Sequence, residues 1–379
     1  MNGRVALTPF VLPGEVARIE TEQERPDLVR TRLVEVISPS LERDRPPCPY
    51  FSECGGCQYQ HARYEFQVAQ KAAILREQLR RVGRIDFTGE IEEVAGPPLH
   101  YRNRSQFHID ERRIGYFADG SHRLVGIDHC PISSPKINET LATLVRMLRD
   151  RRFPDFIRVI ELFTDEANVM LNVLDSGRPV ARRFFEWCAE EIPGLASGAI
   201  DYSVGADIFQ VSHKSFFQVN RFLLDPLIEV AVGDAAGASA VDLYSGVGLF
   251  TLALRRRFDE VTAVESAASA VHDLTANANR AGLDVYIAQA NAEQFLSQTQ
   301  KSPDFVLADP PRSGLGKRVT AELLRLLPPR IHIVSCDPST LARDLAALVA
   351  GGYRISKLTM LDLFPQTYHF ESIAHLTRD

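Results

Sequence analysis

The stretch VDLYSGVGLF, residues 241–250, decides the fold expected for the second half of the chain. A strand-like run is followed by Gly246 and Gly248, and then by the first apolar residues of a helix. Glycines at a strand-to-helix turn let the backbone approach a ligand in the crevice beyond the strand ends. A dinucleotide-binding turn has a third glycine that opens the helix, but Leu249 and Phe250 stand there. The turn therefore favours a nucleoside-type cofactor without a pyrophosphate, such as S-adenosyl-L-methionine.

Strand-like and helical stretches alternate from about residue 206 to residue 379. Such alternation predicts a parallel sheet with helices on both faces, so the fold class expected is α/β with a Rossmann-like domain. The strand after the glycine turn ends at Glu265, where an acidic side chain can bind both hydroxyls of a ribose. A later strand ends at Asp309 in the run ADPPRSG. An acid followed by two prolines at a strand end is common in methyltransferases that act on a planar nitrogen base.

The first half of the chain lacks this regular alternation of strand-like and helical stretches. Residues 1–42 alternate apolar and polar positions in short stretches broken by turns, which predicts a small β module. Residues 43–205 combine a loop rich in proline, glycine and cysteine with helical and strand-like runs, which predicts a central α+β domain. With the Rossmann-like domain over residues 206–379, we expect three domains.

Charge and composition restrict the class of protein. The formal net charge is −6, so charge alone gives no reason to expect a nucleic-acid partner. No apolar run approaches the roughly 18 residues of a membrane span, and the N-terminus lacks a signal-peptide pattern. We therefore expect a cytoplasmic monomer without membrane contact, whose six cysteines are free, metal-bound or catalytic.

Cys336 follows the strand after Asp309, so it should share the rim where the carboxyl ends of the parallel strands meet. An inert buried thiol is the commoner role of cysteine, but a polar strand end between Ser335 and Asp337 suits a nucleophile. A thiolate that adds to carbon 6 of uracil turns carbon 5 into an enolate that can accept a methyl group. The proton on carbon 5 must then leave, so a general base is required.

Two side chains near the C-terminus are candidates for this base. Glu371 is the first candidate and His369 is the second, with an ordinary surface position as the alternative for both. Gln218, in the run FFQVN, carries a donor and an acceptor, which suits a pyrimidine edge or the cofactor.

Six segments follow one another in the order of a known family: FFQVN, DLYSGVGLF, AVES, DPPRSGL, SCDPSTLARDL and FPQTYHFES. In these segments, within residues 214–379, the chain resembles the RNA 5-methyluridine methyltransferases that act on 23S ribosomal RNA or on the T-loop of tRNA. The resemblance implies Cys336 as the nucleophile and Glu371 as the general base. It also implies that the cofactor and target pocket is lined by Gln218, Tyr244, Glu265, Asn291 and Asp309.

This chain differs from many members of the resembled family at one cofactor-contact position, and it lacks the second catalytic cysteine that some members have. Many relatives have Asn where this chain has Leu249, so the resemblance does not extend to that cofactor contact. Relatives with a second catalytic cysteine in the Pro-Pro region methylate cytosine, but ADPPRSG contains none, so uracil is the expected base. Two alternatives stay open, namely a cytosine methyltransferase and an iron–sulfur RNA-binding protein without methyl transfer.

Cys48, Cys54 and Cys57, with the distant Cys130, supply four thiols. Cys-x2-Cys with further cysteines indicates a metal site, and spacing alone leaves zinc and an iron–sulfur cluster both open. The lone fourth cysteine is unlike the second Cys-x2-Cys pair of a zinc ribbon. In the family that the chain resembles, this pattern holds a 4Fe–4S cluster. Four protein ligands leave no open iron site, so the expected role of the cluster is structural.

Arginines and aromatic residues are interleaved in HYRNRSQFHID, residues 100–110, and RRIGYF, residues 112–117. Such a pattern can clamp phosphates and stack unpaired bases, although charged strand faces are usually just solvated. The resembled family has YRN here, and the small β module resembles a shortened TRAM domain, an RNA-binding barrel. We therefore expect an RNA substrate, ribosomal RNA in preference to tRNA, from which the target nucleotide is extracted. The candidate contacts are Tyr101, Arg102, Arg104, Phe107, Arg112, Arg113 and Tyr116.

Overall fold

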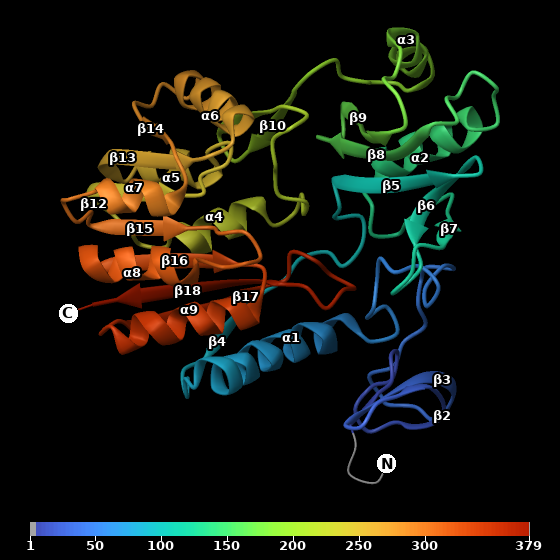
Figure 1. Cartoon of the computed structure of the whole chain (residues 1–379), viewed down its shortest axis with the longest axis horizontal. Coiled ribbons are helices and arrows are strands. Elements are labelled where there is room, and N and C mark those ends of the chain that lie inside the picture. The colour runs from blue at the N-terminus through green and yellow to red at the C-terminus, as the bar shows by residue number, and fades with distance from the viewer. Residues whose placement is uncertain (1–4, 379) are drawn as a thin grey trace.

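The computed structural model describes residues 5–378, and its largest element is an eight-stranded sheet built mainly from the second half of the chain (Figure 1). The first five strands in spatial order run parallel, and β18 pairs antiparallel with β16. This arrangement confirms the predicted α/β, Rossmann-like class. In spatial order the strands are β14 (Tyr286–Gln289), β13 (Phe258–Glu265), β12 (Gly237–Leu243), β15 (Phe305–Ala308), β16 (Arg330–Ser335), β18 (Glu371–Thr377), β17 (Arg354–Leu361) and β4 (Ile91–Val94).

Helices cover both faces of this sheet, and successive side chains of one strand reach the two faces in turn. On β15, Phe305 and Leu307 pack with α4 and α5, whereas Val306 and Ala308 pack with α8 and α9. We call this sheet with its helices the large lobe. Its helices are α4 (Leu224–Val232), α5 (Leu249–Arg255), α6 (Ala268–Arg280), α7 (Ala292–Gln298), α8 (Gly316–Leu326) and α9 (Pro338–Ala350).

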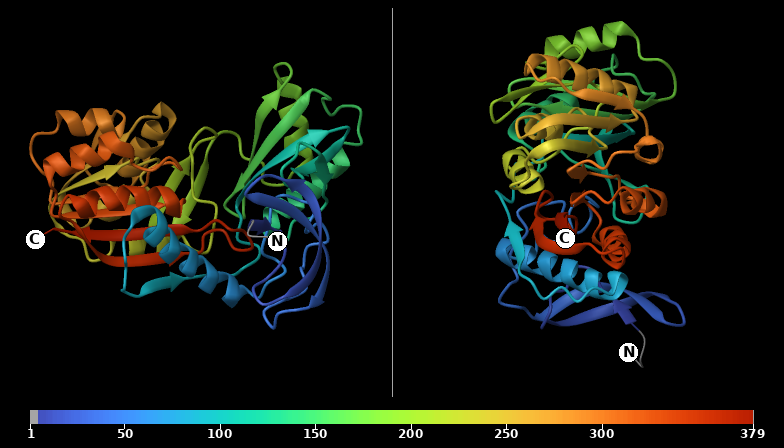
Figure 2. Two further views of the ribbon diagram at one scale, coloured as in Figure 1. Left: turned by 60° about the horizontal axis from the view of Figure 1, so that its bottom comes forward. Right: turned by 90° about the vertical axis from the view of Figure 1, so that its left-hand side faces the viewer.

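Two elements from the first half of the chain belong to the large lobe. Strand β4 pairs in parallel with β17. Helix α1 (Tyr64–Gln78) continues into the π-helical turn η1 (Leu79–Gly83), and both pack against α9 (Figure 2). Both elements come from the range assigned above to the central domain. The domain boundaries after residues 42 and 205 stay a prediction.

A second lobe, which we call the central lobe, contains an antiparallel five-stranded sheet in the order β7-β6-β5-β8-β9. Its core includes Phe107, Ile160 and Trp187, and the backbone then returns to the large lobe through the hairpin β10–β11. The elements are β5 (Arg104–Asp110), β6 (Arg113–Phe117), β7 (Leu124–Gly126), α2 (Pro135–Met147), β8 (Ile157–Thr164), β9 (Val169–Ser176), α3 (Arg182–Glu191), β10 (Ile200–Val204) and β11 (Asp207–Val211).

The small β module predicted at the N-terminus is a three-stranded sheet in the order β1-β3-β2. Its strands are β1 (Val5–Leu7), β2 (Val16–Glu24) and β3 (Leu28–Ser38), and residues 1–4 of the predicted module lie outside the described residues. Within residues 5–378, none of the helices is both long and apolar enough to cross a bilayer.

Candidate active site

The carboxyl ends of the parallel strands bring four candidate residues to one rim of the large sheet. Gly246 follows β12, Glu265 ends β13, Asp309 follows β15 and Cys336 follows β16. Parallel neighbours point their carboxyl ends in the same direction, so residues that are far apart in the sequence meet at this edge.

Glu371 reaches the same rim from the opposite chain direction, because it is the first residue of the antiparallel strand β18. Ser335, the last residue of β16, lies opposite Ser372 in the register of this pair. Cys336 is the first residue after β16 on the rim side, and Glu371 is the residue of β18 that lies next to Ser372 on the rim side. The register therefore sets the candidate nucleophile beside the candidate base.

The thiol of Cys336 is half-buried, and burial raises its pKa to about 11. The carboxyls of Glu371 and Asp309 raise the pKa further, whereas the guanidinium of Arg312 opposes them. Without RNA, the sulfur is thus a thiol at neutral pH, and its nucleophilic form depends on the balance of the three charges around it.

The carboxyl of Glu371 is 5% exposed, and its Oε2 atom has no hydrogen-bond partner among residues 5–378. Burial raises its pKa well above the ordinary value, the neighbouring Asp309 adds to this, and Arg312 opposes it. A buried carboxyl without a partner is costly unless a ligand uses it. A raised pKa also makes the ionised form a stronger proton acceptor.

Asp309 is the third acid of the rim, and burial raises its pKa to about 7. The Nε2 atom of Gln218 donates to Oδ2 of Asp309 over 3.5 Å. Gln218 itself is buried, and it comes from the loop that precedes the large sheet. The pair presents an amide and a carboxyl to the same space.

The rival base, His369, is half-buried two residues before Glu371. Burial lowers its pKa to about 4, and the nearby Arg312 acts in the same direction. The imidazole is therefore neutral at physiological pH and is able to accept a proton.

The glycine turn holds Glu265 in place. Oε2 of Glu265 accepts from the backbone N–H of Gly246 at 3.0 Å, and Oε1 accepts from the N–H of Ala267 at 2.7 Å. A Cβ atom added to Gly246 would meet nothing within 4 Å, so the turn faces open space. Tyr244, just before the turn, has a φ of 63°, a left-handed backbone conformation that is rare outside glycine and often marks a functional turn.

Two other candidate cofactor residues have structural contacts. A Cβ atom on Gly248, whose φ is 95°, would lie 2.4 Å from Cδ1 of Leu274, so this glycine permits close packing against α6. Asn291 is exposed beyond the end of β14, and its Oδ1 accepts from the N–H of Gln294 at 2.8 Å, which caps α7.

Comparison with known proteins agrees with this architecture. Residues 205–379 match the profile of the family described as tRNA (Uracil-5-)-methyltransferase. An uncharacterized RNA methyltransferase of Aquifex aeolicus is 32% identical over 99% of this chain and 94% of its own length. The 23S rRNA (uracil(1939)-C(5))-methyltransferase RlmD of Pectobacterium atrosepticum is 32% identical over 100% of this chain and 90% of its own length. The chain belongs to the RNA 5-methyluridine methyltransferase family.

A solved relative extends the match to the three-dimensional structure. The tRNA (uracil-54, C5)-methyltransferase of Pyrococcus abyssi, solved with S-adenosyl-L-homocysteine, is 25% identical and superposes with a TM-score of 0.77. The match covers 98% of this chain and 95% of that one. This RNA 5-methyluridine methyltransferase is therefore an RNA (uracil-C5)-methyltransferase in activity class, with RNA as its substrate.

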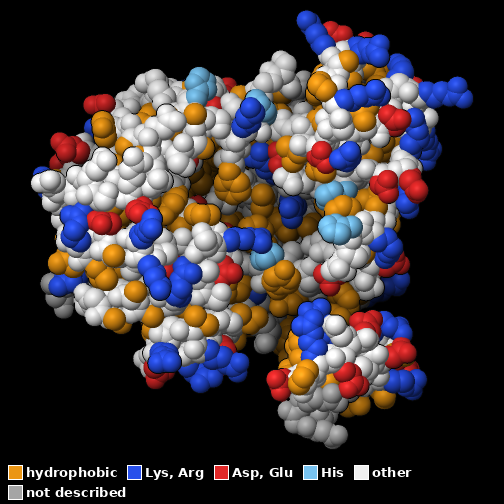
Figure 3. Space-filling model, in the orientation of Figure 1, with side chains coloured by type: hydrophobic (Ala, Val, Ile, Leu, Met, Phe, Trp, Pro, Cys, Tyr) orange, Lys and Arg blue, Asp and Glu red, His pale blue; other side chains and the backbone are white. Residues whose placement is uncertain are grey.

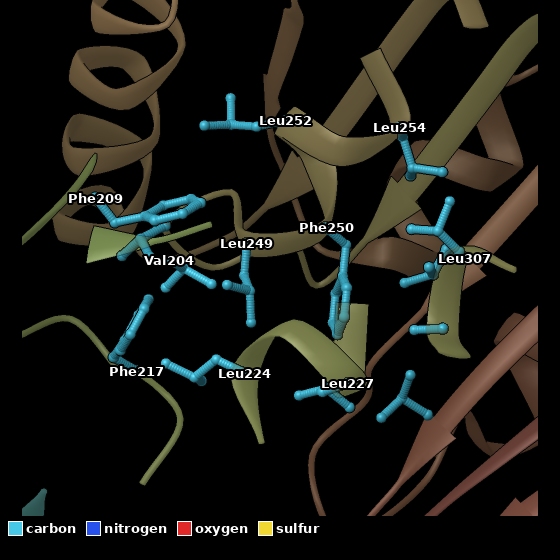
Figure 4. Packing of buried hydrophobic residues seen from close by; sticks show 14 of the residues in the cluster. Val204, Phe209, Phe217, Leu224, Leu227, Leu249, Phe250, Leu252, Leu254 and Leu307 are labelled. Atoms are coloured by element: carbon cyan, nitrogen blue, oxygen red, sulfur yellow. The ribbon is translucent and has the colours of Figure 1, made fainter. Parts of the chain in front are cut away.

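In this RNA 5-methyluridine methyltransferase, Leu249 belongs to the hydrophobic core. Its side chain is 7% exposed and lies among the labelled apolar residues Val204, Phe217 and Leu224 (Figure 4). A polar side chain would leave unpaired atoms in this cluster, so the apolar residue fits its surroundings.

The loop between β17 and β18, residues 362–370, leads to the candidate base Glu371, and we call it the catalytic loop for this reason. Hydrogen bonds from other parts of the chain hold several of its residues. The backbone N–H groups of Gln58 and Tyr59 both donate to the carbonyl of Gln366, each at 2.9 Å. Gln366 has a φ of 69°, so these bonds stabilise an uncommon backbone conformation. Further bonds run from Lys71 Nζ to Asp362 Oδ1 (2.7 Å) and the Phe364 carbonyl (3.1 Å), from Asn220 Nδ2 to the Leu363 carbonyl (3.1 Å), and from Tyr101 Oη to the Pro365 carbonyl (3.0 Å).

The four candidate metal ligands line one cavity, whose walls are Cys48, Cys54, Cys57 and Cys130 with neighbouring aromatic and apolar residues. None of the six cysteines forms a disulfide. Burial raises the pKa of Cys54 to about 11 and that of Cys57 to about 12. Within residues 5–378, no group of three or more metal-binding side chains is gathered closely enough for one ion. The cluster of metal ligands stays a prediction.

Several of the predicted RNA contacts are unavailable to RNA. Tyr101 and Phe107 are fully buried, and Tyr101 anchors the catalytic loop as described. Arg104 is 9% exposed, and it donates to Glu161 and to the carbonyl of Ser215, each at 2.8 Å. The prediction of RNA contact was therefore wrong for Tyr101, Phe107 and Arg104, whereas Arg112 and Arg113 are exposed and stay candidates.

Arg312 belongs to the candidate site, although it is not among the site residues predicted from sequence. Arg312 directly follows the two prolines in the run ADPPRSG. Its charge acts on Cys336, Glu371 and His369 at once. The available signal was its position directly after the Asp-Pro-Pro strand end, at the rim where the acids meet.

Proposed function

We propose that the enzyme transfers a methyl group from S-adenosyl-L-methionine to carbon 5 of one uridine in 23S ribosomal RNA. The proposal is carried by the adjacency of Cys336 and Glu371, which come directly after Ser335 of β16 and directly before Ser372 of β18, a paired position. It unites a nucleophile with a buried carboxyl that has a free oxygen, which are the two groups that C5 methylation of uracil requires.

Covalent catalysis would proceed through bonds that form and break in a fixed order. The thiol of Cys336 loses its proton to solvent, and its sulfur adds to carbon 6 of uracil. The electron pair of the C5–C6 double bond moves toward the C4 carbonyl to give an enolate. Carbon 5 of the enolate would then bond to the methyl group as the bond from the methyl carbon to the sulfonium sulfur breaks, which would release S-adenosyl-L-homocysteine, and the C4 carbonyl would form again. Glu371 removes the proton from carbon 5, the double bond forms again, and the bond from sulfur to carbon 6 breaks.

The residues at the strand ends fit a nucleoside cofactor. S-Adenosyl-L-methionine supplies an electrophilic methyl group on its sulfonium sulfur. Glu265, held by the N–H groups of Gly246 and Ala267, would accept from the ribose hydroxyls. Gln218, Tyr244, Asn291 and Asp309 are the other residues that we assign to this pocket, and the open space above Gly246 leaves room for the ligand.

Ribosomal RNA is the preferred target because two relatives, each 32% identical over the whole chain, are named as methyltransferases of uracil 1939 in 23S rRNA. The tRNA T-loop is the second candidate, because the superposed Pyrococcus abyssi enzyme acts on uracil 54 of tRNA. Methylation of 23S rRNA and tRNA transcripts with labelled cofactor, followed by nucleoside analysis, tests both. We expect 5-methyluridine in the rRNA. Label only in tRNA would support the second target, label in cytidine would reject uracil as the base, and no label would reject the enzyme function.

We further propose that Cys48, Cys54, Cys57 and Cys130 hold a 4Fe–4S cluster with a structural role. Support comes from the four-thiol donor set around one cavity. Directly after Cys57, the N–H groups of Gln58 and Tyr59 bind Gln366. The cysteine loop thus supports the loop that carries Glu371.

A further inference from the structure

We infer that an arginine-lined groove in the central lobe binds the phosphate backbone of the RNA that flanks the target uridine. The inference rests on the proposed function, since it concerns the same substrate. We call this feature the arginine groove. Its charged lining consists of Arg112, Arg151, Arg152, Arg178 and Arg183, against the single carboxylate of Asp155.

This concentration of positive charge stands out in a chain whose net charge is −6. Lys and Arg side chains gather at the upper right of the molecule, over the region of α3 (Figure 3). A local basic surface on an acidic protein is the electrostatic pattern that attracts a polyanion to one place.

Two of the groove arginines have their guanidinium planes fixed by aromatic rings. Arg152 lies over the ring of Trp187 at 4.3 Å, and Arg178 lies over the ring of Phe156 at 4.3 Å. Stacking on a ring restrains a guanidinium, and the N–H groups of Arg178 have no hydrogen-bond partner within residues 5–378, whereas Nε and Nη2 of Arg152 donate to Asp150. Paired N–H donors in one plane match two oxygens of a phosphate.

Arg151 and Arg183 supply charge that the protein does not neutralise. Both are exposed, and neither has a hydrogen-bond or ion-pair partner within residues 5–378. By contrast, Arg152 donates to Oδ2 of Asp150 at 2.9 Å, and Arg178 lies 4.0 Å from Asp155. The unpaired arginines are therefore the ones that a phosphate ligand would engage first.

The aromatic residues of the groove favour phosphates over bases as the ligand. Phe153, Phe184 and Trp187 are 2%, 4% and 7% exposed, so they form the floor and offer no open ring face. Arg152 already covers Trp187. Stacking of unpaired bases needs exposed rings, so the groove fits a backbone, as in shape-based recognition of double-stranded RNA.

The groove is also well placed for an accessory contact. Helix α3 lies at the top of the central lobe, whereas the rim with Cys336 belongs to the large lobe (Figure 1). A short RNA that fills only the active site would not reach it, whereas a longer RNA with a flanking stem would. The affinity for RNA should therefore depend on substrate length through these arginines.

The test compares the full-length enzyme with the variant Arg151→Gln/Arg183→Gln on a short and a long RNA that contain the same target uridine. For the long RNA we expect Kd and KM to rise about tenfold in low salt, with kcat unchanged. The slope of log Kd against log salt concentration should fall by about 1.4 to 1.8, as expected for two lost phosphate contacts. For the short RNA, we expect Kd, KM and kcat to be the same in the variant and in the unmodified enzyme.

A matched control removes the same charge elsewhere. Arg80 and Arg81 of η1 are exposed arginines of the large lobe, so Arg80→Gln/Arg81→Gln reproduces the change in net charge. An equal loss of affinity in the control, or an equal loss on the short RNA, would overturn the inference. An unchanged affinity of the groove variant for the long RNA would overturn it as well. Failure of the unmodified enzyme to methylate either RNA would instead reject the proposed function.

Discussion

Gln67 of α1 and Gln366 of the catalytic loop bind each other through two hydrogen bonds. Nε2 of Gln67 donates to Oε1 of Gln366 at 3.0 Å, and Oε1 of Gln67 accepts from the backbone N–H of Gln366 at 3.2 Å. Both side chains are buried. These two hydrogen bonds fix the catalytic loop at Gln366, five residues before Glu371. Gln58 and Tyr59, which follow Cys57, bind the carbonyl of the same residue.

Substitution Gln67→Ala should loosen the catalytic loop, because the buried N–H and amide of Gln366 lose their partners. Each unsatisfied buried group costs about 1 to 3 kcal/mol. We expect a lower melting temperature, faster hydrogen exchange over residues 362–370, and a smaller kcat. The control is Gln70→Ala, on the same helix but half-exposed and without a bond to the loop. Equal effects of the two substitutions would argue against the loop contact as the cause.

Substitution Glu371→Gln should trap the covalent intermediate, because an amide cannot take the proton from carbon 5. Removal of a general base typically slows a step by about 10² to 10⁴. We expect an RNA–protein adduct that survives a denaturing gel and migrates slowly. The double variant Cys336→Ala/Glu371→Gln should form no adduct. Normal product release by the Glu371→Gln variant would show that Glu371 is not the general base, and His369 would then be the candidate.

Substitution Cys336→Ala should abolish methyl transfer while leaving a folded protein that binds the cofactor. A matched control is Cys188→Ala, since Cys188 is a buried thiol of the central lobe away from the rim. We expect full activity in the control at a temperature where it stays folded. Any methyl transfer by Cys336→Ala would rule out the thiolate mechanism.

The single-turnover rate should rise with pH between about pH 6 and 9. Because the pKa of Cys336 is about 11 without RNA, the thiolate fraction grows about tenfold for each unit of pH below that value. Ionisation of Glu371, whose pKa is also raised, changes the rate in the same direction. Arg312 lowers both values, so Arg312→Gln should shift the profile to higher pH, whereas Arg312→Lys should shift it less. An unshifted profile in Arg312→Gln would exclude this electrostatic role.

Protein purified without oxygen should be coloured and contain iron and acid-labile sulfide. Substitution Cys57→Ser should lose the iron and also speed hydrogen exchange in residues 362–370, because the loop after Cys57 binds Gln366. Cys188→Ser should keep the iron. Colourless protein that contains zinc would reject the iron–sulfur assignment. If the variant loses iron but hydrogen exchange in residues 362–370 is not faster, the cluster does not stabilise the loop that leads to Glu371.

Features that follow from local pattern were predictable from sequence. The parallel sheet follows from the alternation of strands and helices, and the shared rim of Glu265, Asp309 and Cys336 follows from the common direction of the strands. The pairing of β4 with β17 was not predictable, because a strand of four residues has no local signal for its distant partner.

The burial of polar side chains was not predictable from sequence where polar and aromatic residues alternate. Arg104 looks like an RNA contact in sequence, yet its charge is neutralised by Glu161, 57 residues away. Gln67 and Gln366 gave no signal at all, since a glutamine pair joined across 299 positions has no sequence pattern. Such contacts depend on the assembled fold.

The bond between Gln67 and Gln366 has a consequence for synthesis of the protein. The catalytic loop can take its final form only after both glutamines and β18 have been synthesised, because Gln67 and Gln366 are separated by 299 positions. Closing contacts of such long sequence separation is slow and comes late in folding. A nascent chain that has not yet formed β18 would thus carry the thiol without its base, and it could not release the methylated RNA.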